Sequence, residues 1–322
     1  MAEFMQVSDV EDGTRLLRWF LRHFPSMPQR EFYKLCRGGQ IRVNSKRVRG
    51  QEILRADDMI RIPPTVAGYA VARKKTESGN VFSLADLEAL RKCIVHNDKD
   101  VVVFNKPAGL AVQGGTGIRK SVDKMAAALF PYDKISLVHR LDKETSGLLV
   151  VAKNQRAAQF LADAFQNKTA HKEYLALLNG EVSPKSGVID NWMLKGQVFD
   201  EPGRVNNGTG PRTQRAITEY RVLSTAAGCV SWVLFSPKTG RTHQLRLHSA
   251  FSLNAPIVGD ALYGGQRTVG CALQSMLETN NLFLFAYKLT FQHPSTGRMI
   301  TLRATVPEFM QPVIKFLELK MP

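Results

Sequence analysis

The sequence has 322 residues, of which 44% are hydrophobic and 22% charged, a composition typical of globular proteins with a sizeable core. It excludes a disordered tail protein, a collagen-like repeat and a small disulfide scaffold, and its length favours two domains. Lys and Arg outnumber Asp and Glu by 44 to 28, which gives a net charge of +16 and favours an acidic partner, with nucleic acid ahead of an anionic membrane surface.

Residues 10–66 predict a small α/β module. Apolar side chains recur at helical spacing in 14–24 and again in 28–37, and Thr14 is placed to cap the first helix. Three short segments follow that predict strands and are separated by turn residues: 40–43, 47–48 and 59–62. This order of elements predicts a compact unit with its own core.

Positive charge is concentrated in this module, where ten Lys or Arg and a single acid, Glu31, lie between Arg15 and Arg49. The cations fall on both predicted helices and the loop after them, which favours RNA binding over an ordinary solvated helix face. The stretch RLLRWFL…REFYKLCRGGQIRVNSKRV…LRADDMIRIPP resembles the S-four-type RNA-binding domain, named for a ribosomal protein. The resemblance implies an RNA-gripping surface of six residues: Arg30, Lys34, Arg37, Arg42, Lys46 and Arg47.

The rest of the chain predicts a linker and a larger domain. Residues 67–92 are small, polar and charged, and predict a linker with one short helix near 84–91. In 93–322, strand-like segments alternate irregularly with two short helices, for which Ser121 and Asn154 are the expected caps. Hairpin signals favour antiparallel pairing. We therefore expect an α+β fold with a large mixed, mostly antiparallel sheet flanked by helices, and a Gly- and Asn-rich loop over 192–215.

Compartment and assembly are expected from weaker signals. The four cysteines, Cys36, Cys93, Cys229 and Cys271, form no CxxC pair and predict reduced thiols in a cytoplasmic protein. The first thirteen residues lack the apolar core of a signal peptide, and the longest apolar runs have strand length, so we expect neither a leader nor a membrane span. A monomer is expected.

Two polar clusters carry the chemistry. LVHRLDKETSGLLVVAK at 137–153 places the carboxylate of Asp142 near Arg140, just before an apolar strand. Spacing alone leaves a structural salt bridge and a catalytic acid open, and favours the salt bridge. KTGRTHQLRLH at 238–248 gathers cations and histidines that are costly to bury without partners, or that form an exposed basic helix start.

Together the two clusters resemble the RluA family of pseudouridine synthases. HRLDKETSGLLVVAK is similar over fifteen residues to that family's signature, His-Arg-Leu-Asp-x-x-Thr-Ser-Gly-Leu-Leu. Four more stretches resemble later or earlier family motifs and occur in the family's order: NKPAGLAVQGGTG, KEYLALLNG, TGRTHQLRLH and PIVGDALYGG. The Gly-Gly-Thr-Gly after Val112-Gln113 resembles the RluC branch more than the RluD branch.

The resemblance implies a reaction without a cofactor. Uridine loses its glycosidic bond, and the uracil rotates and rejoins the sugar through carbon 5, so no metal, nucleotide or redox group is needed. The sequence contains no Walker loop, Rossmann fingerprint or metal-ligand spacing. Asp142 matches the family's essential aspartate, acting as a nucleophile or as a base that removes a sugar proton, and the sequence leaves both routes open.

Further residues match family positions around a flipped nucleotide. Arg140 matches the arginine that enters the vacated space, and Tyr174 the tyrosine that packs against the target base. Arg246 matches the basic residue that ion-pairs with Asp142 and opposes the rise in pKa caused by desolvation. Two more residues are assigned to RNA contact: Lys106, which could instead shape the pocket, and Arg241, which competes with Arg246 for the ion pair.

Three classes of function follow from these patterns. The first is an RNA pseudouridine synthase, the second a non-catalytic RNA-binding or ribosome-assembly protein on the same fold, and the third a basic peripheral membrane protein. The complete set of matched residues favours the enzyme, because a protein that only binds RNA need not retain them. The N-terminal module and the RluC-like glycine stretch favour large-subunit ribosomal RNA, with a tRNA-directed or RluD-like synthase as the alternative.

Overall fold

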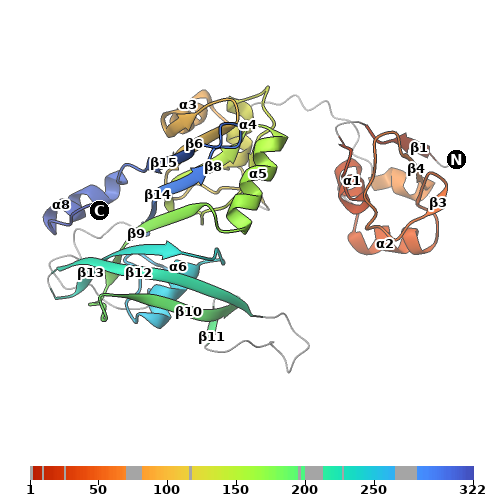
Figure 1. The fold of residues 1–322 in the computed structure, drawn as a ribbon. Helices are drawn as coiled ribbons and strands as arrows, with labels where there is room; N and C mark the ends of the chain where they lie inside the picture. Colours follow the sequence, from red (N-terminus) through yellow and green to blue (C-terminus); the bar gives the residue numbers. More distant parts are fainter. Residues whose placement is uncertain are drawn as a thin grey trace. The chain divides into compact units, whose positions relative to one another are not determined.

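The protein is described here by a computed structural model. It describes residues 3–8, 11–24, 27–69, 82–115, 118–194, 197–199, 213–226, 228–264 and 281–322. The chain divides into two compact units, Met1–Gly79 and Asn80–Pro322 (Figure 1). Thr116 and Gly117 of the glycine stretch, Gly265 and Cys271 lie outside the described residues. No helix in these ranges is long and apolar enough to cross a membrane.

The N-terminal unit combines two helices with a small antiparallel sheet in the order β1-β4-β2-β3. Phe20 and Phe32 join the two helices, with ring centroids 5.1 Å apart. Arg15 is the N-cap of the first helix, because its extended backbone bridges Ile53, so the expected Thr14 cap is wrong. The elements are β1 (Glu3–Gln6), α1 (Leu16–His23), α2 (Gln29–Arg37), β2 (Arg42–Val43), β3 (Lys46–Arg47), β4 (Met59–Ile62) and the 3-10 helix η2 (Pro64–Tyr69).

The second unit is built on one large sheet. Within the described residues its strand order is β11-β10-β12-β13-β9-β14-β8-β6-β5, with β15 paired to β14 and β7 to β8. The strands are β5 (Ile94–Asn97), β6 (Val101–Lys106), β7 (Ser136–Leu137), β8 (Ser146–Ala152), β9 (His171–Asn179), β10 (Ser186–Leu194), β11 (Gln197–Phe199), β12 (Gln214–Ala226), β13 (Val230–Pro237), β14 (Leu284–Gln292) and β15 (Met299–Arg303). Only the β14–β8 pair is parallel among these described strands, which confirms the expected mixed, mostly antiparallel sheet.

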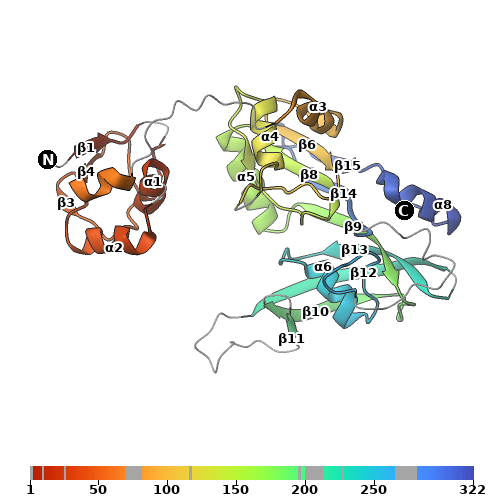
Figure 2. The same ribbon diagram turned by 180° about the vertical axis from the view of Figure 1, so that it is seen from behind.

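Helices flank this sheet, as expected. In Figure 2, which shows the molecule from behind, α3, α4 and α5 gather around β6 and β8, and α6 lies beside β12 and β13. Asn154 caps α5 by accepting a hydrogen bond from the Ala157 N–H at 2.8 Å, whereas the Ser121 hydroxyl bonds Asp123 instead of the helix backbone. The helices are α3 (Leu84–Lys92), α4 (Val122–Leu129), α5 (Gln155–Gln166), α6 (Gln244–Leu247), a π-helical turn η3 (His248–Ser252), η4 (Glu308–Met310) and α8 (Gln311–Phe316).

The loop expected over 192–215 is wrong at both ends. β10 continues to Leu194, and β12 begins at Gln214, which pairs with Met193. β11 pairs with β10 in between. The ends of this segment contain neither Gly nor Asn and pair as strands, whereas its Gly and Asn residues, at 196 and within 203–210, lie outside the described residues.

Gly147 allows the parallel pair that orders the site. β8 follows directly on the Asp142 loop and is buried along its whole length. Gly147 has a φ of +104°, and a Cβ there would lie 2.4 Å from the Ala286 carbonyl oxygen. Only glycine permits this close approach of β14 to β8.

Candidate active site

One cavity collects the residues expected at the site. It encloses about 570 Å³, part of it open to solvent, and is lined by the Asp142 loop, by β9 and by the segment from the end of β13 into α6. Five of the predicted residues line it: Arg140, Asp142, Tyr174, Arg241 and Arg246. The fold therefore brings together side chains that are about a hundred residues apart in the sequence.

Asp142 and Tyr174 present different chemistry to this cavity. The half-buried Asp142 carboxylate has no hydrogen bond or ion pair to any residue that the structure describes, so it is free to meet a ligand. Tyr174 is 8% exposed, and burial, together with the charge of Asp142, raises the pKa of its phenol. The phenol therefore stays protonated at neutral pH and can donate a hydrogen bond or a proton.

Arg246 does not ion-pair with Asp142, contrary to the expectation from the sequence. Its guanidinium is buried and donates from Nε to Asp260 Oδ2 at 2.8 Å and from Nη2 to Asp260 Oδ1 at 2.6 Å. The Asp260 side chain is fully buried, so its charge needs this cation, and a bidentate pair satisfies both groups. Asp142 acts on Arg246 only through space, where its charge helps to raise the pKa of the guanidinium against the effect of burial.

Asp260 also organises the wall behind Arg246. Its Oδ1 accepts hydrogen bonds from the backbone N–H groups of Leu262 and Tyr263 at 2.9 and 3.0 Å. The Arg246 guanidinium lies 5.2 Å from the centroid of the Tyr263 ring, and the Tyr263 hydroxyl lies 2.9 Å from His243 Nδ1. The motif PIVGDALYGG contains Asp260 but does not indicate this role, for which the available signal is an acid among small and apolar residues.

Arg140 and Arg241 lie at the rim of the cavity. Both side chains are exposed, and each also lines a neighbouring hollow. Arg241 donates from Nε to the Arg215 carbonyl oxygen at 3.1 Å, which ties it to β12. The sequence left Arg241 and Arg246 as alternatives for the ion pair with Asp142. In the structure Arg246 is buried and Arg241 is exposed.

Lys106 is not available to RNA. It is 0% exposed, and its Nζ donates to the carbonyl oxygens of Pro107, Leu110 and Lys143 at 2.9, 2.9 and 3.0 Å. Burial lowers the pKa of Lys106 to about 7, while Glu144 and Asp142 oppose that change. The predicted RNA contact is therefore wrong, and the alternative expectation, a lysine that shapes the pocket, agrees with a side chain that ties the 107–110 loop to the Asp142 loop.

The six basic residues predicted in the N-terminal unit lie on α2 and the β2–β3 hairpin. Five are exposed, and Arg42 is half-buried with its Nε donating to the Gly39 carbonyl oxygen at 3.0 Å. Lys34 is 3.6 Å from Glu31, a contact that is weak between exposed groups. The full set is Arg30, Lys34, Arg37, Arg42, Lys46 and Arg47.

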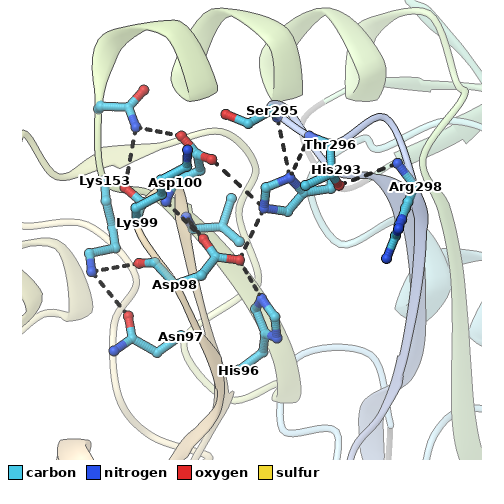
Figure 3. Close-up of polar contacts among 12 residues, drawn as sticks. His96, Asn97, Asp98, Lys99, Asp100, Lys153, His293, Ser295, Thr296 and Arg298 are labelled. Carbon is cyan, nitrogen blue, oxygen red and sulfur yellow. Dashed lines mark hydrogen bonds and ion pairs between the residues drawn. The ribbon is translucent and has the colours of Figure 1, made fainter.

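One cluster outside the cavity has the residue types of a metal site. Oxygens of Asp98 and Asp100 and a ring nitrogen of His293 lie within 4.8 Å of one another (Figure 3). His293 Nδ1 accepts hydrogen bonds from the N–H groups of Ser295 and Thr296 at 3.2 and 3.1 Å, so the ring proton belongs on Nε2, which donates to Asp98 Oδ2 at 3.0 Å. A metal bound to Nε2 would move that proton to Nδ1, where it would point at two N–H donors. The residues therefore fit a hydrogen-bonded cluster and do not fit a metal site.

Known proteins that resemble this chain belong to the family expected from the sequence motifs that line the cavity. The family described as RNA pseudouridylate synthase matches residues 100–251. Ribosomal large subunit pseudouridine synthase C of Vibrio vulnificus (strain CMCP6) is 34% identical over 318 residues, covering 97% of this chain and 96% of that protein. The protein of the same name from Escherichia coli (strain K12) is 33% identical over 302 residues, covering 92% and 91%.

A solved structure that resembles this chain carries the name of the same family. That of human RNA pseudouridylate synthase domain containing 4 has a TM-score of 0.62 and 30% identity, and covers 73% of this chain and 97% of that chain. The similarity thus extends over nearly the full length of the sequence and over most of the fold. The chain belongs to the RNA pseudouridylate synthase family and is RluC-like: it is an isomerase that converts uridine to pseudouridine in RNA.

Proposed function

We propose that this enzyme modifies specific uridines of large-subunit ribosomal RNA, and that Asp142 is the carboxylate that reacts with the nucleoside. The observation that carries the proposal is the Asp142 carboxylate, which is unpaired among the described residues and faces the same cavity as the protonated Tyr174 phenol and the buried Arg246. Relatives named for the large ribosomal subunit match this chain over 97% of its length, N-terminal unit included, which supports the choice of substrate.

Asp142 starts either of two routes. As a nucleophile it bonds to sugar carbon 1′ while the glycosidic electron pair leaves with uracil. As a base it takes the proton from carbon 2′ while the same bond breaks, which leaves a glycal. In both routes the uracil turns and carbon 5 forms the new bond to carbon 1′. In the first route this bond displaces the Asp142 carboxylate, and in the second Asp142 returns its proton to carbon 2′ as the bond forms. Carbon 5 then loses its proton and nitrogen 1, which has lost its bond to the sugar, gains one, so no atom is gained or lost overall.

Tyr174 and Arg140 handle the base. Tyr174 packs against the uracil, and its phenol carries the proton that leaves carbon 5. Arg140, exposed at the rim, enters the space that the flipped nucleotide vacates, which offsets part of the cost of unstacking, a few kcal/mol. Arg246 supports the ionised Asp142 through space, with its own position held by Asp260.

The N-terminal unit docks the RNA. We assign residues 10–66 to RNA binding through the six basic residues of α2 and the β2–β3 hairpin, 67–92 to a linker and 93–322 to catalysis. The boundary between the two compact units, after Gly79, falls within that linker and supports the assignment. The enzyme acts as a cytoplasmic monomer in this proposal.

The test is a map of pseudouridines in total RNA. Deletion of the gene should remove sites from large-subunit ribosomal RNA, wild type should restore them, and Asp142→Ala should not. Retention of all ribosomal sites in the deletion would contradict the substrate, and loss from tRNA alone would replace it with the alternative. Restoration by Asp142→Ala would contradict the role of the carboxylate.

A further inference from the structure

The active-site cavity meets a second hollow of about 1690 Å³, part of it open to solvent. We refer to it as the basic trough, and it lies between the end of α5, the start of β9 and the end of β13. The residues shared by the two cavities form their junction: Arg140, Lys172, Pro237, Thr239, Gly240 and Arg241. Any strand that delivers a base to Asp142 through the trough has to pass these residues.

The described lining of the basic trough has more cations than carboxylates to pair with them. Its two carboxylates are each paired to a lysine, Glu173 to Lys288 at 3.1 Å and Glu219 to Lys238 at 2.7 Å. Four further cations line it without a carboxylate within 4.0 Å in the described part of the chain: Arg140, Lys168, Lys172 and Arg241. An anion is therefore the ligand that this wall favours.

Lys172 differs from the other three cations because it is partly buried and contacts an aromatic ring. It lies two residues before Tyr174 on β9, so both side chains leave the same face of the strand. Its Nζ lies 5.6 Å from the centroid of the Phe165 ring, and a Cβ on Gly240 would be 3.7 Å from it. The cation–π contact holds the ammonium at the junction before any ligand arrives.

The Lys172 ammonium has no hydrogen bond or ion pair to any described residue, although the side chain is partly buried. Burial accordingly lowers the pKa of Lys172. A partly desolvated cation without a counter-ion weakens the folded state. An unpaired, partly buried charge of this kind is typical of a binding site, where the ligand supplies the missing partner.

We propose that Lys172, with Arg140 and Arg241, forms an anion subsite that binds a phosphodiester group beside the flipped nucleotide. The proposal deepens the function proposed above and rests on it. With the uracil next to Asp142 and Tyr174, the backbone of the same nucleotide runs out through the junction, where the three cations meet its phosphates. The subsite contributes binding energy for the nucleotide that enters the cavity.

Three variants of the full chain test the subsite. Lys172→Met removes the charge at similar length, Lys172→Arg retains it, and Lys185→Met removes an exposed lysine that lines neither cavity and pairs with Glu181 at 3.0 Å. The substrate is an unmodified transcript of large-subunit ribosomal RNA. Binding is measured across a range of salt concentrations, and pseudouridine formation at limiting and saturating RNA.

Lys172→Met should raise Kd and KM about tenfold, and reduce the slope of log K against log salt by about 1, with kcat within threefold of wild type. Lys172→Arg should keep the salt slope of wild type because it keeps the charge, and Lys185→Met should match wild type in Kd, KM and kcat. Unaltered Kd and salt slope in Lys172→Met, or a loss confined to kcat, would overturn the subsite. If wild type binds the transcript but modifies none of its uridines, the proposed substrate fails, while the binding comparison still decides the subsite.

Discussion

Arg246 and Asp260 form a buried bidentate ion pair at 2.8 and 2.6 Å, on the wall of the cavity that holds Asp142. The pair leaves Asp142 without a direct counter-ion among the described residues, so its carboxylate is open to a ligand in the cavity. The guanidinium remains close enough for its charge to interact with Asp142. The arginine is thus held rigidly by one aspartate while it influences another.

Asp260→Asn should lower the free energy of unfolding by about 3 kcal/mol, because it leaves the buried Arg246 guanidinium without a charged partner. Urea unfolding measures this loss. The matched control is Asp190→Asn, which breaks an exposed bidentate pair to Arg215 (Asp190 Oδ1–Nε 2.8 Å) and should lose much less stability, because water screens and replaces the interaction. Equal losses in the two variants would show that the buried pair stabilises the fold no more than the exposed pair does.

Asp142→Asn should separate activity from stability. The carboxylate has no partner in the described chain, so the free energy of unfolding should stay within about 0.5 kcal/mol of wild type. Single-turnover pseudouridine formation should fall by about 10⁴-fold, with RNA affinity retained. Glu144→Gln, which removes a 44% exposed carboxylate two residues away, is the control and should keep full activity. Comparable activity in the two variants would exclude Asp142 as the reacting group.

Lys106→Met should destabilise the fold without weakening RNA binding. Three carbonyl oxygens lose a buried charged donor, and we expect a loss of about 3 kcal/mol in urea unfolding. Lys120→Met, which removes an exposed lysine paired with Asp86 at 2.7 Å, should lose about 1 kcal/mol or less. A rise in the Kd for RNA with unchanged stability would restore the RNA contact expected from the sequence.

Asp98 should make the fold sensitive to acid. Burial raises its pKa, but hydrogen bonds from the backbone N–H groups of Val101 and Asp100 and from the rings of His96 and His293 outweigh this and lower the pKa to about 2. A carboxyl group with a depressed pKa in the folded state stabilises the protein above its unfolded value of about 4, and this contribution disappears as the pH falls towards 2.

Asp98→Asn should therefore be less stable than wild type by about 2 kcal/mol at pH 6. The difference should shrink between pH 4 and pH 2 in thermal or urea unfolding. A difference that is constant across this range would mean that the hydrogen bonds in Figure 3 do not depend on the charge of Asp98.

Local sequence patterns determined the elements and the residues that meet in the cavity. Helical and alternating periodicity predicted most helices and strands, because burial of one face is a local requirement, and Asn154 caps its helix as expected. The Thr14 cap and the loop at 192–215 were wrong, since pairing with Ile53 and across Met193–Gln214 is set by distant segments. β1 was missed because its four residues, mostly exposed, are defined by pairing with β4.

The sequence motifs identify Asp142, Arg140, Tyr174 and Arg246, which line one cavity although they lie far apart along the chain. Tertiary structure alone decided their partners. Burial makes Asp260 the partner of Arg246 and turns Lys106 into an internal tie. Folding places Lys172 of β9 beside Phe165 of α5, with no counter-ion among the described residues. A charge acquires its role from the groups that surround it after folding, and a linear sequence does not record which groups those are.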